Sequence, residues 1–155
     1  MNKALASIGL AAVLLAPASL ALAQAPVAKV TGGITMSGPS QQISFVAFDG
    51  AGKGNVSYTN YDYPGGLSYS ADVLCANVNE TTDNAVFVFQ IPAGFPGLSG
   101  LYVGVQVHDG GTPGTNGDTY GHTSTASQAT AMSWCNNSTL SVTNYPITSG
   151  NLVVH

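Results

Sequence analysis

The densest group of side chains that could do chemistry lies in a glycine-rich segment of the second half of the chain. It consists of four oxygen-bearing side chains: Asp109, Thr112, Asn116 and Asp118. Carboxylate, hydroxyl and amide oxygens are the ligands that Ca²⁺ prefers, so calcium is the one cofactor that this segment suggests. His108 and His122 flank the segment, and they would instead favour a transition metal. The simplest interpretation is a turn in which aspartates accept hydrogen bonds from their own backbone, because the spacing matches no EF-hand loop.

A second group of residues could bind an organic ligand. Tyr58, Tyr61, Tyr63 and Trp134 are candidates for an aromatic platform that stacks on a sugar or another ring. Tyr61 and Tyr63 would share a side if their strand is regular. Tyrosines are also common strand formers that simply cover β surfaces, and that is the alternative.

No catalytic residue can be assigned from the pattern of nucleophiles and bases. The sequence lacks a G-x-S-x-G elbow, and its nearest approach is Gly97-Leu98-Ser99-Gly100. The carboxylates that could pair for glycoside hydrolysis show no supporting spacing: Asp62, Asp72, Glu80 and Asp83. We therefore expect a protein that is not an enzyme, with a secreted hydrolase of unknown substrate as the alternative.

The two cysteines of the chain, Cys75 and Cys135, predict one disulfide in an oxidising compartment. Neither belongs to a C-x-x-C motif or adjoins a histidine, which argues against a catalytic or metal-binding thiol. The bridge would close a loop of about 60 residues and stabilise the fold by about 4 kcal/mol through chain entropy.

A succession of short β-type segments must position these residues. Runs rich in Val, Ile, Phe and Tyr are bounded by Gly, Pro, Asn or Asp. The expected strands are 28–36, 41–48, 53–61, 67–76, 84–91, 101–108, 119–124, 139–143 and 151–155, and a short helical turn can form within 127–135. Since no strand alternates with a helical pattern, the sequence predicts an all-β fold, either an antiparallel β-sandwich or a small closed barrel of about eight strands.

Three of these strands carry further information about burial. Residues 86–89 are apolar on both faces, whereas residues 101–108 alternate cleanly and predict a half-buried strand. Residues 152–154 are again apolar on both faces, at the very end of the chain. We expect this last strand to be paired on both sides, which would hold the terminus and remove a sheet edge.

The first residues of the chain have the three parts of a signal peptide. A lysine at position 3 precedes an apolar run from Ala4 to Leu15, and Leu20-Ala21-Leu22-Ala23 supplies the small residues of a cleavage site. The apolar run is shorter than the roughly 20 residues that span a bilayer. We therefore expect residues 1–23 to be removed and residues 24–155 to form one secreted domain with no membrane span.

Charge excludes some partners of this mature domain. It keeps only Lys29 and Lys53 as basic residues against seven acidic ones. Such a chain cannot neutralise a row of phosphates, so nucleic acid is excluded as a partner. A glycan or a cell-surface protein remains as an expected partner, while the sequence leaves the oligomeric state open.

Two segments carry a resemblance to a group of small secreted bacterial β-domain proteins. The stretch Val107–Gly114 with Gly117-Asp118-Thr119 resembles their V-x-D-N-G-x-P-G…G-D-T turn, and Gly150–His155 is similar to their C-terminal G-N-[LIV]-x-V-H strand. Gly110 replaces the usual Asn, and glycine also suits a left-handed turn position. The resemblance implies a small β domain with no assigned activity.

Together these features predict a secreted, non-enzymatic β domain that acts in extracellular binding or as a structural element of the cell surface. The alternatives are the hydrolase above and a calcium-stabilised adhesion or carbohydrate-binding module.

The export signal can be tested by intact-mass measurement of protein recovered from outside the cytoplasm. We expect the mature chain to begin at Gln24, because cleavage after Ala25 would place Pro26 first. A recovered chain that retains residues 1–23 would contradict this expectation.

Overall fold

The computed structural model describes residues 27–36, 40–111 and 116–155. The predicted signal peptide and Thr112 lie outside these ranges. The elements in chain order are β1 Lys29–Met36, β2 Gln41–Phe48, β3 Gly50–Ala51, β4 Gly54–Asn60, β5 Leu67–Asn79, β6 Asn84–Gln90, β7 Tyr102–His108, β8 Thr119–Thr125, α1 Gln128–Trp134 and β9 Tyr145–Val154.

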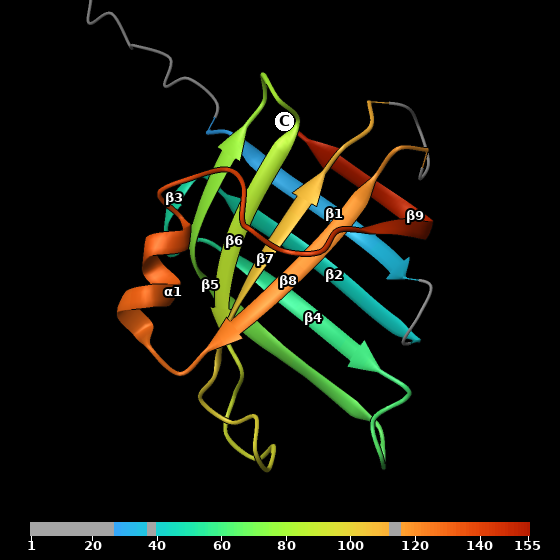
Figure 1. Cartoon of the computed structure of the whole chain (residues 1–155), viewed down its shortest axis with the longest axis vertical. Coiled ribbons are helices and arrows are strands. Elements are labelled where there is room, and N and C mark those ends of the chain that lie inside the picture. Colours follow the sequence, from blue (N-terminus) through green and yellow to red (C-terminus); the bar gives the residue numbers. More distant parts are fainter. Residues whose placement is uncertain (1–26, 37–39, 112–115) are drawn as a thin grey trace, which may run out of the picture.

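Eight of the strands form one closed antiparallel barrel (Figure 1). They follow one another around the ring in chain order, and β9 returns to pair with β1. The two-residue β3 pairs with β5 beside the ring. The prediction of an antiparallel all-β fold is confirmed, and the barrel is the architecture formed because the last strand joins the first.

Alternation of side chains along each strand fills the barrel interior. In β2, Ile43, Phe45 and Ala47 are buried, whereas the intervening Gln42 and Ser44 are exposed. The Phe45 ring lies 4.7 Å from the Phe87 ring, measured between centroids. It also lies against Gly32 of the neighbouring strand, where a Cβ would come within 2.6 Å of the ring. A small residue opposite a large one thus lets the central ring fit inside.

A bulge in β5 turns Cys75 to the outside of the barrel. The register of β5 against β6 shifts between Val73 and Cys75. Val73 and Ala76 therefore both belong to the interior core, while Cys75 joins a separate cluster beside α1. This outward position lets Cys75 form the disulfide with Cys135, at a Cα–Cα distance of 6.1 Å. The predicted bridge is confirmed.

The outer face of β6, β7 and β8 is covered by α1 and by the segment 135–144 that follows it (Figure 1). The Trp134 ring packs on Gly104 so closely that a Cβ there would lie 2.4 Å from it. Gln106, also on the outer face, accepts from the Leu140 backbone amide and donates to the Asn144 side chain. Within the described ranges, no helix is long and apolar enough to cross a membrane.

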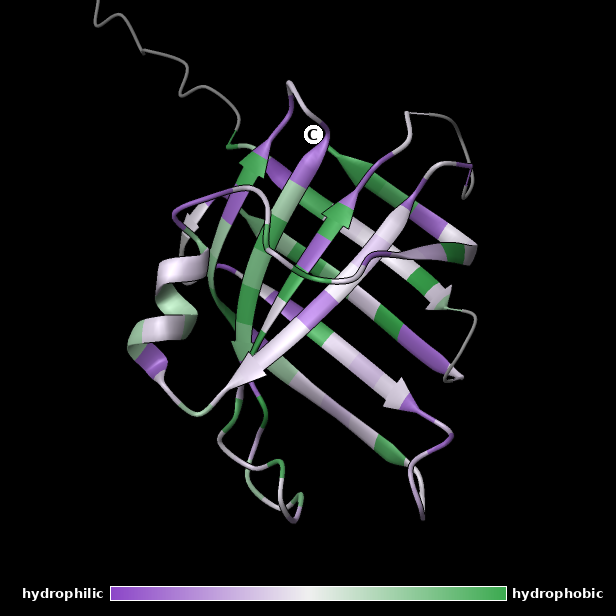
Figure 2. Cartoon of the chain, viewed as in Figure 1, coloured by the Kyte–Doolittle hydropathy of each residue, from purple (hydrophilic) through white to green (hydrophobic). Residues whose placement is uncertain are grey.

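This cover corrects two expectations. The alternation of residues 101–108 was expected to leave one face in water, but Gly104 and Gln106 are buried beneath the cover. Residues 139–143 were expected to form a strand and instead belong to the irregular covering segment, because their backbone bonds to a side chain of β7 rather than to a strand. The burial of residues 86–89 on both faces is confirmed, and Figure 2 shows β6 as largely apolar.

The last strand closes the barrel, but it begins at Tyr145, earlier than the expected 151–155, and residues 151–154 pair with β1 alone rather than on both sides. β9 pairs with β1 from Ile147 to Val154, and Lys29 and His155 exchange two further backbone hydrogen bonds of 2.8 Å. On its other side, β9 pairs with β8 only at Thr119 and Tyr120. The ring is therefore tightly closed on one side of β9 and barely closed on the other.

Replacing both cysteines by serine tests the role of the bridge. We expect the free energy of unfolding to fall by about 4 kcal/mol, because the reduced chain regains the entropy of a loop of 60 residues. Urea titration followed by emission from Trp134, the single tryptophan, measures this loss. An unchanged urea midpoint would contradict a stabilising role.

Candidate functional site

A cavity of about 270 Å³ opens at one end of the barrel. Five aromatic side chains contribute to its walls: Tyr58, Tyr63, Tyr69, Phe89 and Tyr120. Four polar residues also line it: Gln41, Asn60, His122 and Ser124. The remainder of the wall is aliphatic and comes from β5, from β7 and from the loop between β6 and β7. We call this space the barrel-mouth cavity.

The cavity exists because β8 parts from β9. Beyond Tyr120, residues 121–125 have no partner strand on that side within the described part of the chain. β8 therefore diverges from the closed side of the barrel, as Figure 1 shows. Its alternate residues Tyr120, His122 and Ser124 line one side of the cavity, with Tyr120 buried and with His122 and Ser124 exposed at the rim.

The opposite wall has rings from β4, β5 and β6, and Phe95 of the loop after β6 packs behind them. The Tyr69 ring lies 5.3 Å from Tyr58, 6.2 Å from Phe89 and 5.4 Å from Phe95, measured between centroids. The loop that carries Phe95 is held by Ser99, whose hydroxyl accepts from the Phe95 amide and donates to the Phe95 carbonyl, both at 2.8 Å. This wall is consequently shaped before any ligand enters.

Several polar groups face this largely aromatic space without a protein partner. Gln41 is 7% exposed and Tyr120 is 2% exposed, and neither side chain makes a hydrogen bond to another described residue. Burial raises the pKa of Tyr120, and the nearby Tyr58 and Tyr69 raise it further. Burial also raises the pKa of Tyr69. These phenols are neutral at physiological pH and can act as hydrogen-bond donors.

His122 stands at the rim of the cavity, with its ring 5.6 Å from the Tyr120 ring. Partial burial lowers its pKa below the ordinary value of 6.5, so its imidazole is neutral at pH 7. It makes no hydrogen bond to Ser124 or to a carboxylate within the described residues. His122 and Ser124 therefore lack the hydrogen bond through which a histidine activates a serine nucleophile.

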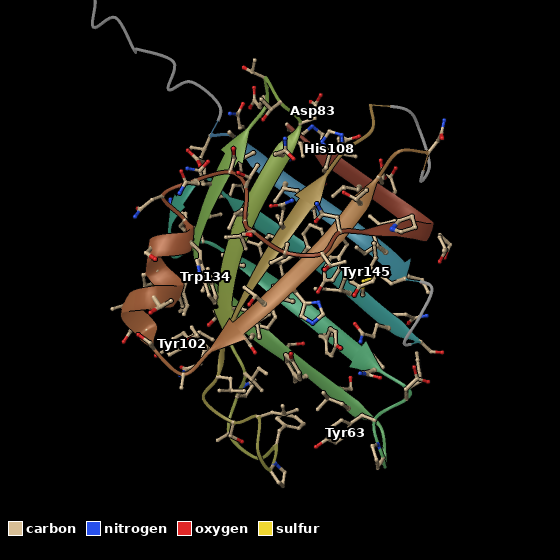
Figure 3. All side chains as sticks on the ribbon, in the orientation of Figure 1. Tyr63, Asp83, Tyr102, His108, Trp134 and Tyr145 are labelled. Carbon is tan, nitrogen blue, oxygen red and sulfur yellow. A yellow bond between two sulfur atoms is a disulfide. The ribbon has the colours of Figure 1, made fainter. Side chains whose placement is uncertain are left out.

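The aromatic residues singled out from the sequence do not form one platform. Tyr63 lines the barrel-mouth cavity, while Trp134 packs in the cluster around Cys75 and α1 on the other side of the molecule (Figure 3). Tyr61 is 62% exposed, and its hydroxyl donates to Gln42 on the outer face at 3.2 Å. Tyr58 and Tyr63 thus belong to the cavity, whereas Tyr61 and Trp134 do not.

The oxygen-rich segment has the hydrogen bonds of a turn. Asp109 accepts from the amide of Gly111 at 2.8 Å and from the amide of Val154 at 3.1 Å, and Asp118 accepts from the amide of Gly110 at 2.9 Å. Within the described ranges, no group of three or more His, Cys, Asp or Glu side chains could hold a metal ion. Asn116 is exposed at the end of the same segment. The two aspartates thus serve to tie the β7–β8 turn to itself and to β9.

A broader groove lies outside the barrel between β5 and the loop after β6. It measures about 590 Å³, and Asp72, Gln90 and Ser99 on its walls are all exposed. Its walls lack the aromatic rings that enclose the barrel-mouth cavity. We therefore regard the barrel-mouth cavity as the candidate site.

Sequence reasoning missed Gln41, Tyr69 and Tyr120, and it considered His122 only as a possible ligand of a transition metal. One signal was available, because Tyr120, His122 and Ser124 alternate and must share a face of any regular strand. That those residues face Tyr58 and Tyr69 across a cavity depends on how the barrel closes.

Asp118 offers a test of the turn. It is 1% exposed and burial raises its pKa above the ordinary value of 3.8, with a lesser contribution from Asp109, while the Gly110 amide and His108 act in the opposite direction. The native state therefore holds the Asp118 proton more tightly than the unfolded state, and stability is lost as pH rises from 3.8 through the raised pKa. We expect Asp118→Asn to match the wild type at lower pH and to be more stable at pH 7.

Urea midpoints measured between pH 3 and pH 7 would show this divergence, with Asp72→Asn as the control at an exposed position. A difference between Asp118→Asn and the wild type that stays constant with pH would contradict it.

Comparison with known proteins adds no family to this description. No family model matches the chain, and no curated protein or solved structure matches it either. The function is therefore inferred from the geometry of the barrel-mouth cavity.

Proposed function

We propose that the mature chain is a secreted, non-enzymatic β-barrel domain that binds a small molecule in the barrel-mouth cavity. The observation that carries this proposal is a preformed, aromatic-walled cavity into which unpartnered polar groups project. Ligand sites are typically concave and mostly apolar, with a few polar groups that orient the ligand, and barrel mouths are common places for them. An eight-stranded barrel is wide enough to hold one small ligand.

Secretion is supported by two features. The first 23 residues have the charged start, apolar run and small-residue cleavage site of a signal peptide. The Cys75–Cys135 disulfide is compatible with an oxidising compartment. The likeness of the turn and the C-terminal strand to small secreted bacterial domains agrees with both.

Binding has more support than the alternatives. A hydrolase needs a nucleophile in contact with a base, and Ser124 and His122 lie two residues apart on one strand without a hydrogen bond. A carbohydrate-binding platform would need Tyr61, Tyr63 and Trp134 on one surface, and these residues occupy different places. A calcium-stabilised module would need free carboxylate oxygens, and three of the four on Asp109 and Asp118 already accept backbone amides.

Titration with N-phenylnaphthylamine, a neutral dye that fluoresces in apolar surroundings, tests the proposal. We expect saturable enhancement with the wild type and at least about tenfold weaker binding by Ser124→Trp, whose indole would occupy the mouth of the cavity. Ser70→Trp is the matched control, because Ser70 is exposed on the outer face of β5. Absence of saturable binding by the wild type, or equal binding by Ser124→Trp, would overturn the proposal.

A further inference from the structure

The chemistry of the cavity walls narrows the class of ligand, and this inference rests on the proposed binding function. None of the described residues that line the cavity is Asp, Glu, Lys or Arg. Among the described wall residues, the group that titrates near neutrality is His122. Its ring lies against Tyr120, and its lowered pKa leaves it neutral at pH 7. A charged ligand would lose its hydration on entry and would find no opposite charge among the described wall residues, which makes its binding unfavourable.

The shape of the walls favours a flat ring. Tyr58 and Tyr69 stand on one side, and Tyr120 stands on the other with the His122 ring against it. Aromatic rings prefer offset or edge-to-face contacts with other rings, and walls of this kind offer both to a ring placed between them. The volume of about 270 Å³ admits a small molecule only.

The polar groups indicate what the ring must carry. The Tyr120 hydroxyl can donate, and the Gln41 amide can both donate and accept. Both residues are more than nine-tenths buried, and neither side chain bonds to another residue in the described ranges. In the described ranges the buried side-chain polar atom without a partner is Asp118 Oδ2, so the polar atoms of Gln41 and Tyr120 are reached from the cavity. A hydroxyl or carbonyl oxygen on a ligand can therefore take the place of water as their hydrogen-bond partner.

We propose that the barrel-mouth cavity selects neutral, flat ring molecules that bear a hydroxyl or carbonyl group, and that it rejects ionised molecules of the same shape. Tyr120 and Gln41 orient the polar group, while the tyrosine rings hold the ring system. Aromatic alcohols and ketones belong to this class, whereas carboxylates, sulfonates and free sugars lie outside it.

Three probes that share one ring system test this selectivity: naphthalene, naphthol and naphthalenesulfonate, the last two substituted at the same ring carbon. Each is titrated as a competitor that displaces N-phenylnaphthylamine from the wild type. We expect naphthol to bind more tightly than naphthalene by about 2- to 10-fold, the value of one hydrogen bond. We expect naphthalenesulfonate to bind at least about tenfold more weakly than naphthol.

Tyr120→Phe assigns the hydrogen bond. This variant should weaken the binding of naphthol by about 2- to 10-fold and leave the binding of naphthalene unchanged, because the substitution removes only the tyrosine hydroxyl. Tyr102→Phe is the matched control, since Tyr102 packs outside the barrel in the cluster around Cys75. The wild-type series is informative even if Tyr120→Phe fails to fold.

The outcomes separate the two proposals. If no probe displaces the dye, or if the dye itself does not bind, the binding function is wrong. If all three probes displace the dye and the sulfonate competes as well as naphthol, the cavity binds ligands but the selectivity for neutral molecules is wrong. If naphthol gains nothing over naphthalene, the roles of Tyr120 and Gln41 are wrong.

Discussion

The pairing of the last strand with the first is the constraint on which the rest of this molecule depends. β9 contributes seven register pairs to β1, and two backbone hydrogen bonds between Lys29 and His155 extend the ladder to the end of the chain. Closure in this way pairs the edge of β1 with that of β9. It also brings the inward faces of all eight strands around one interior space. The hydrophobic core, which includes the Phe45 and Phe87 rings, fills most of this space, and the barrel-mouth cavity remains open at one end.

The same closure is incomplete on the other side of β9, and this asymmetry creates the cavity. Two register pairs hold β8 to β9, and the remainder of β8 diverges. The covering segment 135–144 then supports the outer face of β7 and β8 through Gln106, while Trp134 and the disulfide fasten its start. The protein thus has two hydrophobic clusters, one inside the barrel and one beneath α1. The outer cluster holds the cover in place and leaves the inner cavity open.

The described walls of the cavity are largely aromatic and aliphatic, and they carry no Asp, Glu, Lys or Arg. Neutral tyrosines and a neutral histidine give it hydrogen-bonding capacity without charge, since burial raises the pKa of Tyr69 and Tyr120 and lowers that of His122. Charged residues gather elsewhere: Asp109 and Asp118 organise the β7–β8 turn, where their oxygens bind backbone amides. The barrel-mouth cavity and the β7–β8 turn therefore lie in different parts of the barrel.

Local patterns in the chain were enough to place most strands within a few residues, to identify β6 as buried on both faces and to pair Cys75 with Cys135. They succeeded because alternation, turn residues and cysteine count act over short distances or admit one solution. They failed for residues 139–143 and for the outer face of β7, where a distant segment supplies the cover.

Local sequence patterns also could not predict that Tyr120 and His122 lie across the cavity from Tyr58 and Tyr69. A strand pattern determines the face on which a side chain lies, but only ring closure, the bulge in β5 and the short β8–β9 contact determine what that face meets across the barrel.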